Sequence, residues 1–239
     1  MIPLAPASIA NKFLQEASLW KPPVDPRRIC ALWPTLSVVT ESLDKSGYLL
    51  DLGHLGGEII IRAEDPFGRQ NFTIAHELAH WILDREEKVD TKKVPRTELE
   101  QWCDAFAKEL LLPGNWIRDY LRAGSVKELW YRVRKGHRHF NVSREAFRRR
   151  TGEISNTSIL EVDRNNGTVE FSKQYLSRKS PPPKLRDIFR VIIGQLDSNS
   201  FVYVYTDSLN TYELMGRVVR NDGNKRSFLI CLVPSSSLD

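Results

Sequence analysis

The sequence has few cysteines, few histidines and no long apolar run. Only three of its 239 residues are cysteines, and they stand far apart, as Cys30, Cys103 and Cys231. An odd and scattered set of this kind does not form the disulfide framework of a small secreted protein. No apolar stretch is long enough to span a bilayer, and the first residues show no secretory signal. We therefore expect a cytoplasmic protein with reduced cysteines and no membrane segment.

Neither sign of charge dominates the composition. The chain has 35 Lys and Arg against 30 Asp and Glu, and its formal net charge is +5. Hydrophobic residues make up 41% and charged residues 27% of the sequence, which is ordinary for a globular protein. A chain of this length can hold one sizeable domain with a substantial appendage, or two small domains.

Two of the five histidines stand four residues apart in an apolar segment. Residues 76–80 read His-Glu-Leu-Ala-His, and the flanking residues of segment 72–83 are almost all apolar. Side chains at this spacing share one face of a helix, so both imidazoles can reach one cation. Glu77 lies beside the pair, where its carboxylate can hydrogen-bond a water on the metal, as in zinc peptidases. The alternative is a buried helix whose ionisable groups pair with polar groups elsewhere.

A catalytic zinc usually takes three protein ligands, and the third is expected in segment 98–113. Its apolar residues recur at helical spacing and Pro113 ends it, which predicts an amphipathic helix. Glu100 and Asp104 share one face of that helix. We assign Glu100 as the third ligand and Asp104 as the carboxylate that orients a ligand histidine through its other ring nitrogen. Cys103 is the competing ligand, because a thiolate also binds zinc well.

Segments 71–80 and 100–113 together resemble the ImmA/IrrE-type metallo-endopeptidases. That family typically has a Phe-Thr-Ile-Ala lead into its metal motif, then Glu, three residues and Asp or Asn, and a Leu-Leu-Met-Pro-like end. The resemblance runs from roughly the first forty residues to the Val-Ser-Arg-Glu segment near residue 142, and we find none beyond residue 152. It favours Glu100 over Cys103. The metal ligands that it implies are His76, His80 and Glu100, with Glu77 as catalytic base.

The resemblance also implies a cofactor and a partner. The cofactor is Zn²⁺, or Mn²⁺ in its place. The substrate is a helix-turn-helix transcriptional repressor, whose cleavage relieves repression under stress. Two other interpretations stay open, each with a non-catalytic metal site. One is a DNA-binding regulator, and the other is a partner-binding regulator of the toxin–antitoxin kind.

The patterning predicts an α+β fold with a zincin-like peptidase domain over residues 1–152. This domain has a small antiparallel sheet, the metal-motif helix and further helices. Segment 58–62 is expected to be an edge strand of that sheet, lining the active-site cleft. An extended substrate could add to it through backbone hydrogen bonds; the alternative is an interior strand. The expected strands are 36–40, 47–52 and 58–62, and the other expected helices are 9–19, 27–32, 115–135 and 143–151.

Residues 153–239 are expected to form a small α/β appendage without a catalytic motif. Asn165-Asn-Gly167 predicts the turn of a β-hairpin between strands at 159–162 and 168–171. An exposed linker at 177–184 and a helix at 185–196 follow. Further strands are expected at 201–205, 213–220 and 227–233. From its position alone, we expect the appendage to act as a sensor or interaction module.

A zinc peptidase also needs a donor to stabilise the oxyanion of the tetrahedral intermediate. The candidates in the later helical segment are Tyr131, His137 and His139. His54, in a glycine-rich turn, is a weaker one. Each is more often a surface or structural side chain than a catalytic donor.

Basic side chains are concentrated in the helix expected at 143–151. A positive surface there would attract nucleic-acid phosphate or an acidic segment of a partner protein. We rank nucleic-acid binding second, because no clear pair of helices joined by a tight turn is evident. The expected surface consists of Arg144, Arg148, Arg149 and Arg150.

Overall fold

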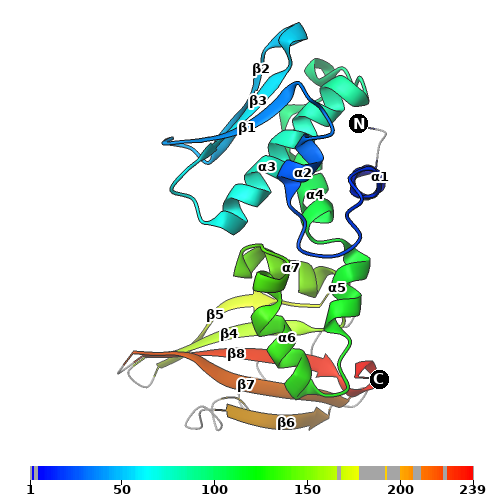
Figure 1. Cartoon of the computed structure of the whole chain (residues 1–239). Helices are drawn as coiled ribbons and strands as arrows, with labels where there is room; N and C mark the ends of the chain where they lie inside the picture. The colour runs from blue at the N-terminus through cyan, green and yellow to red at the C-terminus, as the bar shows by residue number, and fades with distance from the viewer. Residues whose placement is uncertain are drawn as a thin grey trace. The chain divides into compact units, whose positions relative to one another are not determined.

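The computed structural model describes residues 2, 5–165, 168–177, 192, 200–206, 211–222 and 225–238. The chain folds into two compact units. The first comprises Met1–Trp116 and Arg138–Ser143, and the second comprises Ile117–His137 and Arg144–Asp239. Each unit contains helices and a sheet (Figure 1), so the predicted α+β class is confirmed. The last boundary between the two units lies between Ser143 and Arg144, before the predicted domain boundary at residue 152. The assignment of a peptidase domain to residues 1–152 and an appendage to residues 153–239 stays a prediction.

The sheet of the first unit is mixed, with β3 in its centre. Its strands are β1 (Leu36–Glu41), β2 (Gly47–Asp51) and β3 (Gly57–Arg62), in the order β1-β3-β2. β3 pairs in parallel with β1 and antiparallel with β2. The predicted strands are confirmed, whereas the wholly antiparallel sheet and the edge position of segment 58–62 are wrong. The physical reason is the buried run Ile59–Ile61, which needs cover on both faces and is typical of an interior strand.

Two long helices of the first unit carry the predicted metal motif and its partner. The helices are α1 (Pro6–Glu16), α2 (Pro26–Cys30), α3 (Phe67–Trp81) and α4 (Arg96–Leu111). α3 packs against β2, β3 and α4, and α1 packs against α4. The predicted metal-motif helix and the amphipathic helix after it are both confirmed. Shorter helical turns lie at Gly53–Leu55, Ile82–Glu86 and Thr91–Lys93.

The close approach of β2 to α3 depends on Gly47. A Cβ atom at this position would lie 2.6 Å from Thr73 Cγ2 of α3 and 2.6 Å from the carbonyl oxygen of Ile60. Real Cβ atoms do not approach other atoms so closely, and only glycine avoids the clash. Gly47 therefore lets the strand run beside the metal-motif helix.

The second unit has a five-stranded antiparallel sheet in the order β5-β4-β8-β7-β6. The strands predicted in the appendage are confirmed. The predicted hairpin joins β4 and β5, although its turn residues 166–167 lie outside the described residues. So do most of the predicted linker 177–184 and helix 185–196. The strands are β4 (Ser158–Asn165), β5 (Thr168–Tyr175), β6 (Ser200–Thr206), β7 (Thr211–Asp222) and β8 (Lys225–Pro234).

Helix α6 (Val126–His139) packs on this sheet, where the buried Trp130 Nε1 donates a hydrogen bond to the carbonyl oxygen of Leu229, at 2.7 Å. α5 (Gly114–Leu121) precedes it and α7 (Arg144–Ile154) follows it. The helical stretch predicted at 115–135 is thus divided between α5 and α6. None of the helices in the described part of the chain has the length and apolar character needed to cross a membrane.

Packing between α6 and α7 gives a stability prediction at Gly136. A Cβ atom there would lie 2.0 Å from Cζ of Phe147, whose ring is buried. We expect Gly136→Ala to lower the free energy of unfolding by about 1–3 kcal/mol, because overpacking a filled core forces the ring to move. This loss should exceed the gain of up to about 1 kcal/mol that alanine brings to a helix. Denaturant unfolding measures the change.

The matched control is Gly124→Ala, because a Cβ atom at Gly124 would meet no heavy atom within 4 Å. The same substitution there should leave stability unchanged or raise it by about 0.4–1 kcal/mol. Equal unfolding midpoints for the two variants would contradict the packing described for Gly136.

Candidate metal centre

Three side chains from two helices converge in the first unit. His76 and His80 lie one turn apart on α3, and their ring centroids are 5.1 Å apart. Oε2 of Glu100, on α4, lies 3.2 Å from Nε2 of His76 and 4.0 Å from Nε2 of His80. One ligand atom from each residue lies within 4.8 Å of the others. Tetrahedral zinc bonds of about 2.0–2.2 Å separate neighbouring ligand atoms by about 3.3 Å. Two imidazole nitrogens and a carboxylate oxygen in this arrangement fit a zinc ion.

His76 has an orienting carboxylate, and the surroundings of His80 favour its neutral form. Nδ1 of His76 lies 2.9 Å from Oδ1 of Asp104, so a proton on Nδ1 leaves Nε2 free to act as the ligand. Burial lowers the pKa of His80 below its usual range, and a proton on the neighbouring His76 would act in the same direction. A neutral imidazole is the metal-binding form. Asp104 therefore lies where the orienting carboxylate was expected.

Glu77 is half-buried beside this group and is bound to the sheet. Its Oε2 accepts a hydrogen bond from the backbone N–H of Leu49 in β2, at 3.1 Å. Burial raises the pKa of Glu77 above its usual range, opposed by the charge of His76 and by the Leu49 hydrogen bond. Sequence reasoning missed Leu49, because a backbone donor has no side-chain signature. The order of the strands is the only signal that could have identified it.

Comparison with known proteins relates the segment that holds this group to a family. Residues 35–151 match the family model of the IrrE N-terminal-like domain, peptidase M78. This segment of the chain is an M78 domain. The resemblance to ImmA/IrrE-type proteins is thereby confirmed, and the family is of the zinc metallopeptidase type. No curated protein matches the chain. A Mycobacterium tuberculosis transcriptional regulator is similar in structure, with a TM-score of 0.55 and 14% identity over 95% of this chain and 74% of that one. At this identity the likeness shows the fold alone.

Cys103 of the M78 domain is close to the site but is not part of the converging group. It is one helical turn from Glu100 on α4 and is fully buried. Burial raises the pKa of its thiol, and the negative charges of Glu100, Glu77 and Asp104 raise it further. The thiolate that would bind zinc is therefore costly to form in the absence of a cation.

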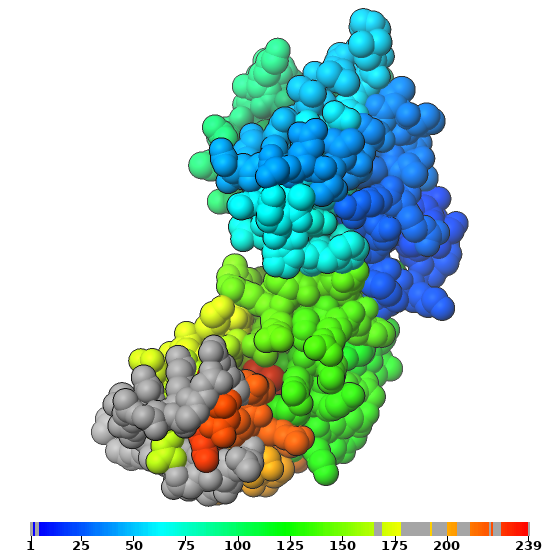
Figure 2. Space-filling model, turned by 60° about the vertical axis from the view of Figure 1, so that its left-hand side comes forward, coloured from blue at the N-terminus to red at the C-terminus, as the bar shows by residue number. Residues whose placement is uncertain are grey.

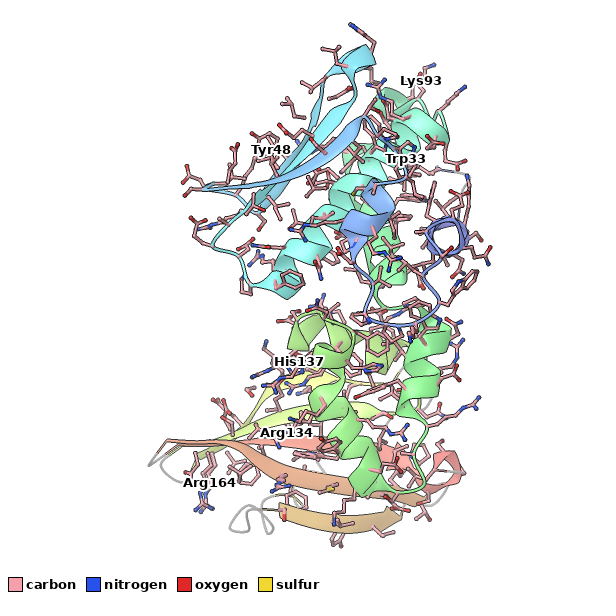
Figure 3. The ribbon with its side chains drawn as sticks, in the orientation of Figure 1. Trp33, Tyr48, Lys93, Arg134, His137 and Arg164 are labelled. Atoms are coloured by element: carbon pink, nitrogen blue, oxygen red, sulfur yellow. The ribbon has the colours of Figure 1, made fainter. Side chains whose placement is uncertain are left out.

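The three proposed oxyanion donors lie on α6 rather than on α3 or α4. Tyr131 is 57% exposed, and Nζ of Lys135 lies 6.0 Å from the centre of its ring. Nδ1 of His137 lies 3.1 Å from the carbonyl oxygen of Arg134; Figure 3 labels both residues on this helix. His139 lies at the end of α6, where its ring contacts Phe140. None of the three belongs to the metal-ligand group found in the described residues, and an oxyanion role for them stays a prediction.

The basic surface expected on α7 is smaller than the sequence indicates. Arg148 and Arg150 are buried and form ion pairs with Glu161 and Glu153. Only Arg144 and Arg149 of the four are exposed. This corrects the expected four-arginine surface: α7 packs against β4 and β5, which turns part of its basic face inward. An exposed pair is a weak attraction for nucleic-acid phosphate.

Proposed function

We propose that the protein is a zinc-dependent endopeptidase that cleaves a helix-turn-helix transcriptional repressor and so relieves repression. The observation that carries this proposal is the position of Glu77. Its carboxylate lies next to a three-residue group suited to zinc and is hydrogen-bonded to the strand β2. A structural metal site has no need of a general base, and its four positions are closed by protein ligands.

In this proposal His76, His80 and Glu100 hold the metal, which is Zn²⁺ or Mn²⁺. Bound there, it would supply Lewis-acid polarisation of the peptide carbonyl and make water more acidic. Asp104 acts as a positioning residue: its Oδ1 fixes the ring of His76. Removal of such supporting partners typically weakens metal binding about 10–100-fold.

Glu77 acts as the general base. The N–H of Leu49 occupies Oε2, which leaves Oε1 to take the proton of the attacking water and pass it to the leaving amine. A base works best when its pKa lies near the working pH. The raised pKa of Glu77 brings this carboxylate closer to that condition than an exposed glutamate would be.

The substrate is expected to lie along β2. β2 pairs with β3 on one side only among the described strands, so it is the edge strand that adjoins α3. Segment 58–62, for which the sequence predicts this role, lies in the interior strand β3. The N–H of Leu49 is bound to Glu77, but an extended peptide can add to the rest of the β2 edge through backbone hydrogen bonds. This would bring its carbonyl groups past Glu77.

The second part of the proposal is a regulatory substrate. A regulatory role agrees with the M78 family and with the name of the structural neighbour, a transcriptional regulator. The three cysteines are buried and unpaired, which agrees with a reducing cytoplasm. A cytoplasmic endopeptidase must be selective, and one repressor is a suitably narrow target.

The test uses the full chain, loaded with zinc or manganese, and the helix-turn-helix repressor encoded beside its gene. We expect metal-dependent cleavage at a single position, detected by intact-mass spectrometry and abolished by a chelator. Metal bound at one equivalent without cleavage of this repressor would contradict the repressor assignment. A stable uncleaved complex would favour the partner-binding regulator. Salt-dependent DNA binding without cleavage would favour the DNA-binding regulator.

A further inference from the structure

Strand β6 forms an edge of the second sheet and exposes apolar side chains. Among the described strands it pairs only with β7. Figure 1 shows it as the outermost strand of this sheet, and Figure 2 shows part of it, in gold, at the molecular surface. Val202 and Val204 are 58% and 56% exposed, and Tyr203 between them is 38% exposed. Phe201, in contrast, is buried in the core of the sheet.

The composition of β6 is unusual for a free edge. The strand reads Ser-Phe-Val-Tyr-Val-Tyr-Thr over residues 200–206 and contains no charged residue, proline or glycine. Natural edge strands usually carry a charge, a proline or a bulge that prevents pairing with another chain. A seven-residue edge without these devices is a template for a further strand.

The sequence of β6 is nearly palindromic about Tyr203. Antiparallel pairing of two identical strands about this residue would place Tyr203 opposite its own counterpart and Val202 opposite Val204 of the other copy. Phe201 would then oppose Tyr205, and Ser200 would oppose Thr206. The pairs at residues 202–204 join valine with valine and tyrosine with tyrosine, and aromatic and β-branched pairs are favourable. A two-fold axis at Tyr203 therefore satisfies the rule that a symmetric interface is self-complementary.

We propose that β6 is a dimerisation strand that pairs antiparallel with β6 of a second copy of this chain, centred on Tyr203. The two five-stranded sheets then join into one continuous sheet. This dimer goes beyond the peptidase activity and does not depend on it. Pairing of one edge strand buries less area than a standard stable interface, which buries at least about 1,200 Å². We therefore expect a weak dimer, with a dissociation constant on the order of micromolar.

The test is sedimentation equilibrium of the full chain between about 1 and 300 μM, a range that brackets a micromolar dissociation constant. We expect the wild type to shift from monomer to dimer. V202K/V204K places like charges opposite each other across the two-fold axis and should stay monomeric throughout. V202E/V204K carries the same number of new charges but places opposite charges together across the axis, and its lysine at position 204 faces Glu213 of β7, so it should again dimerise. The control V219K changes an exposed valine on the interior strand β7 and should dimerise like the wild type.

A second measurement does not require the fold to tolerate two new charged side chains on β6. Tyr203→Cys should form a disulfide-linked dimer under mild oxidation, because directly opposite Cβ atoms are about 4.5–5.5 Å apart. The native cysteines are buried and should not compete, and Val219→Cys should form no disulfide-linked dimer under the same oxidation. A monomeric wild type at the highest concentration would overturn the proposal. So would unchanged dimerisation of a folded V202K/V204K, or equal behaviour of the two charge variants. Pairing of β6 with another protein only would appear as a monomeric wild type.

Discussion

Replacing Glu77 by glutamine is expected to lower kcat for peptide cleavage by at least about 10²–10⁴-fold, the contribution of a positioned general base. Glutamine keeps the size of the side chain and an oxygen that can accept the hydrogen bond from Leu49. The position of the side chain should therefore persist while its ability to take a proton is lost. Zinc content, measured by elemental analysis, should remain at the wild-type level, because the three proposed ligands are unchanged.

The matched control for Glu77→Gln is Glu58→Gln. Glu58 lies on β3, where its carboxylate accepts a hydrogen bond from Ser37 and lies outside the converging group. This variant removes one negative charge from the same unit and should cleave at the wild-type rate. If Glu77→Gln retained cleavage within tenfold of Glu58→Gln with zinc bound, Glu77 would not be the base, and the proposed mechanism would be wrong.

Helical periodicity made the histidine pair and Glu77 accessible to sequence reasoning. Spacing within one helix fixes which side chains share a face, and α3 forms over the predicted segment. Periodicity within one helix could not predict that Glu100 lies near the histidines, because this depends on how α4 packs against α3. Here the spacing of Glu100 and Asp104, and the family resemblance, provided the missing long-range information.

Features that depend on strand order or on inter-element packing were harder to predict. Alternation of apolar residues identified β1, β2 and β3 but could not show that β3 lies between the other two. The hydrogen bond from Leu49 to Glu77 follows from that order and was therefore missed. Arg148 and Arg150 looked like surface cations because their partners, Glu161 and Glu153, are recognisable only in the folded unit.

Replacing Glu100 by alanine is expected to weaken zinc binding more than about 100-fold. Removing a residue that only supports a ligand typically weakens metal binding about 10–100-fold. Oε2 of Glu100 lies near both histidine nitrogens, so its loss removes one of three proposed ligands. The dissociation constant is measured by competition with a chromogenic chelator. A second measurement is thermal unfolding, because zinc at 100 times its dissociation constant stabilises a protein by about 2.7 kcal/mol. If binding is weakened more than about 100-fold, that stabilisation should fall below about 0.4 kcal/mol in Glu100→Ala at the same zinc concentration.

The decisive comparison is with Cys103→Ser, which removes the competing ligand from the same helix. The Cys103 thiol is fully buried, and its pKa is raised by burial and by three nearby carboxylates. Ionising it to bind zinc would leave Glu100 without a role at a site whose geometry already brings that carboxylate to the histidines. Cys103→Ser should therefore bind zinc within a fewfold of the wild type. Loss of zinc from Cys103→Ser, with retention by Glu100→Ala, would make Cys103 the third ligand and leave Glu100 as a neighbouring surface carboxylate.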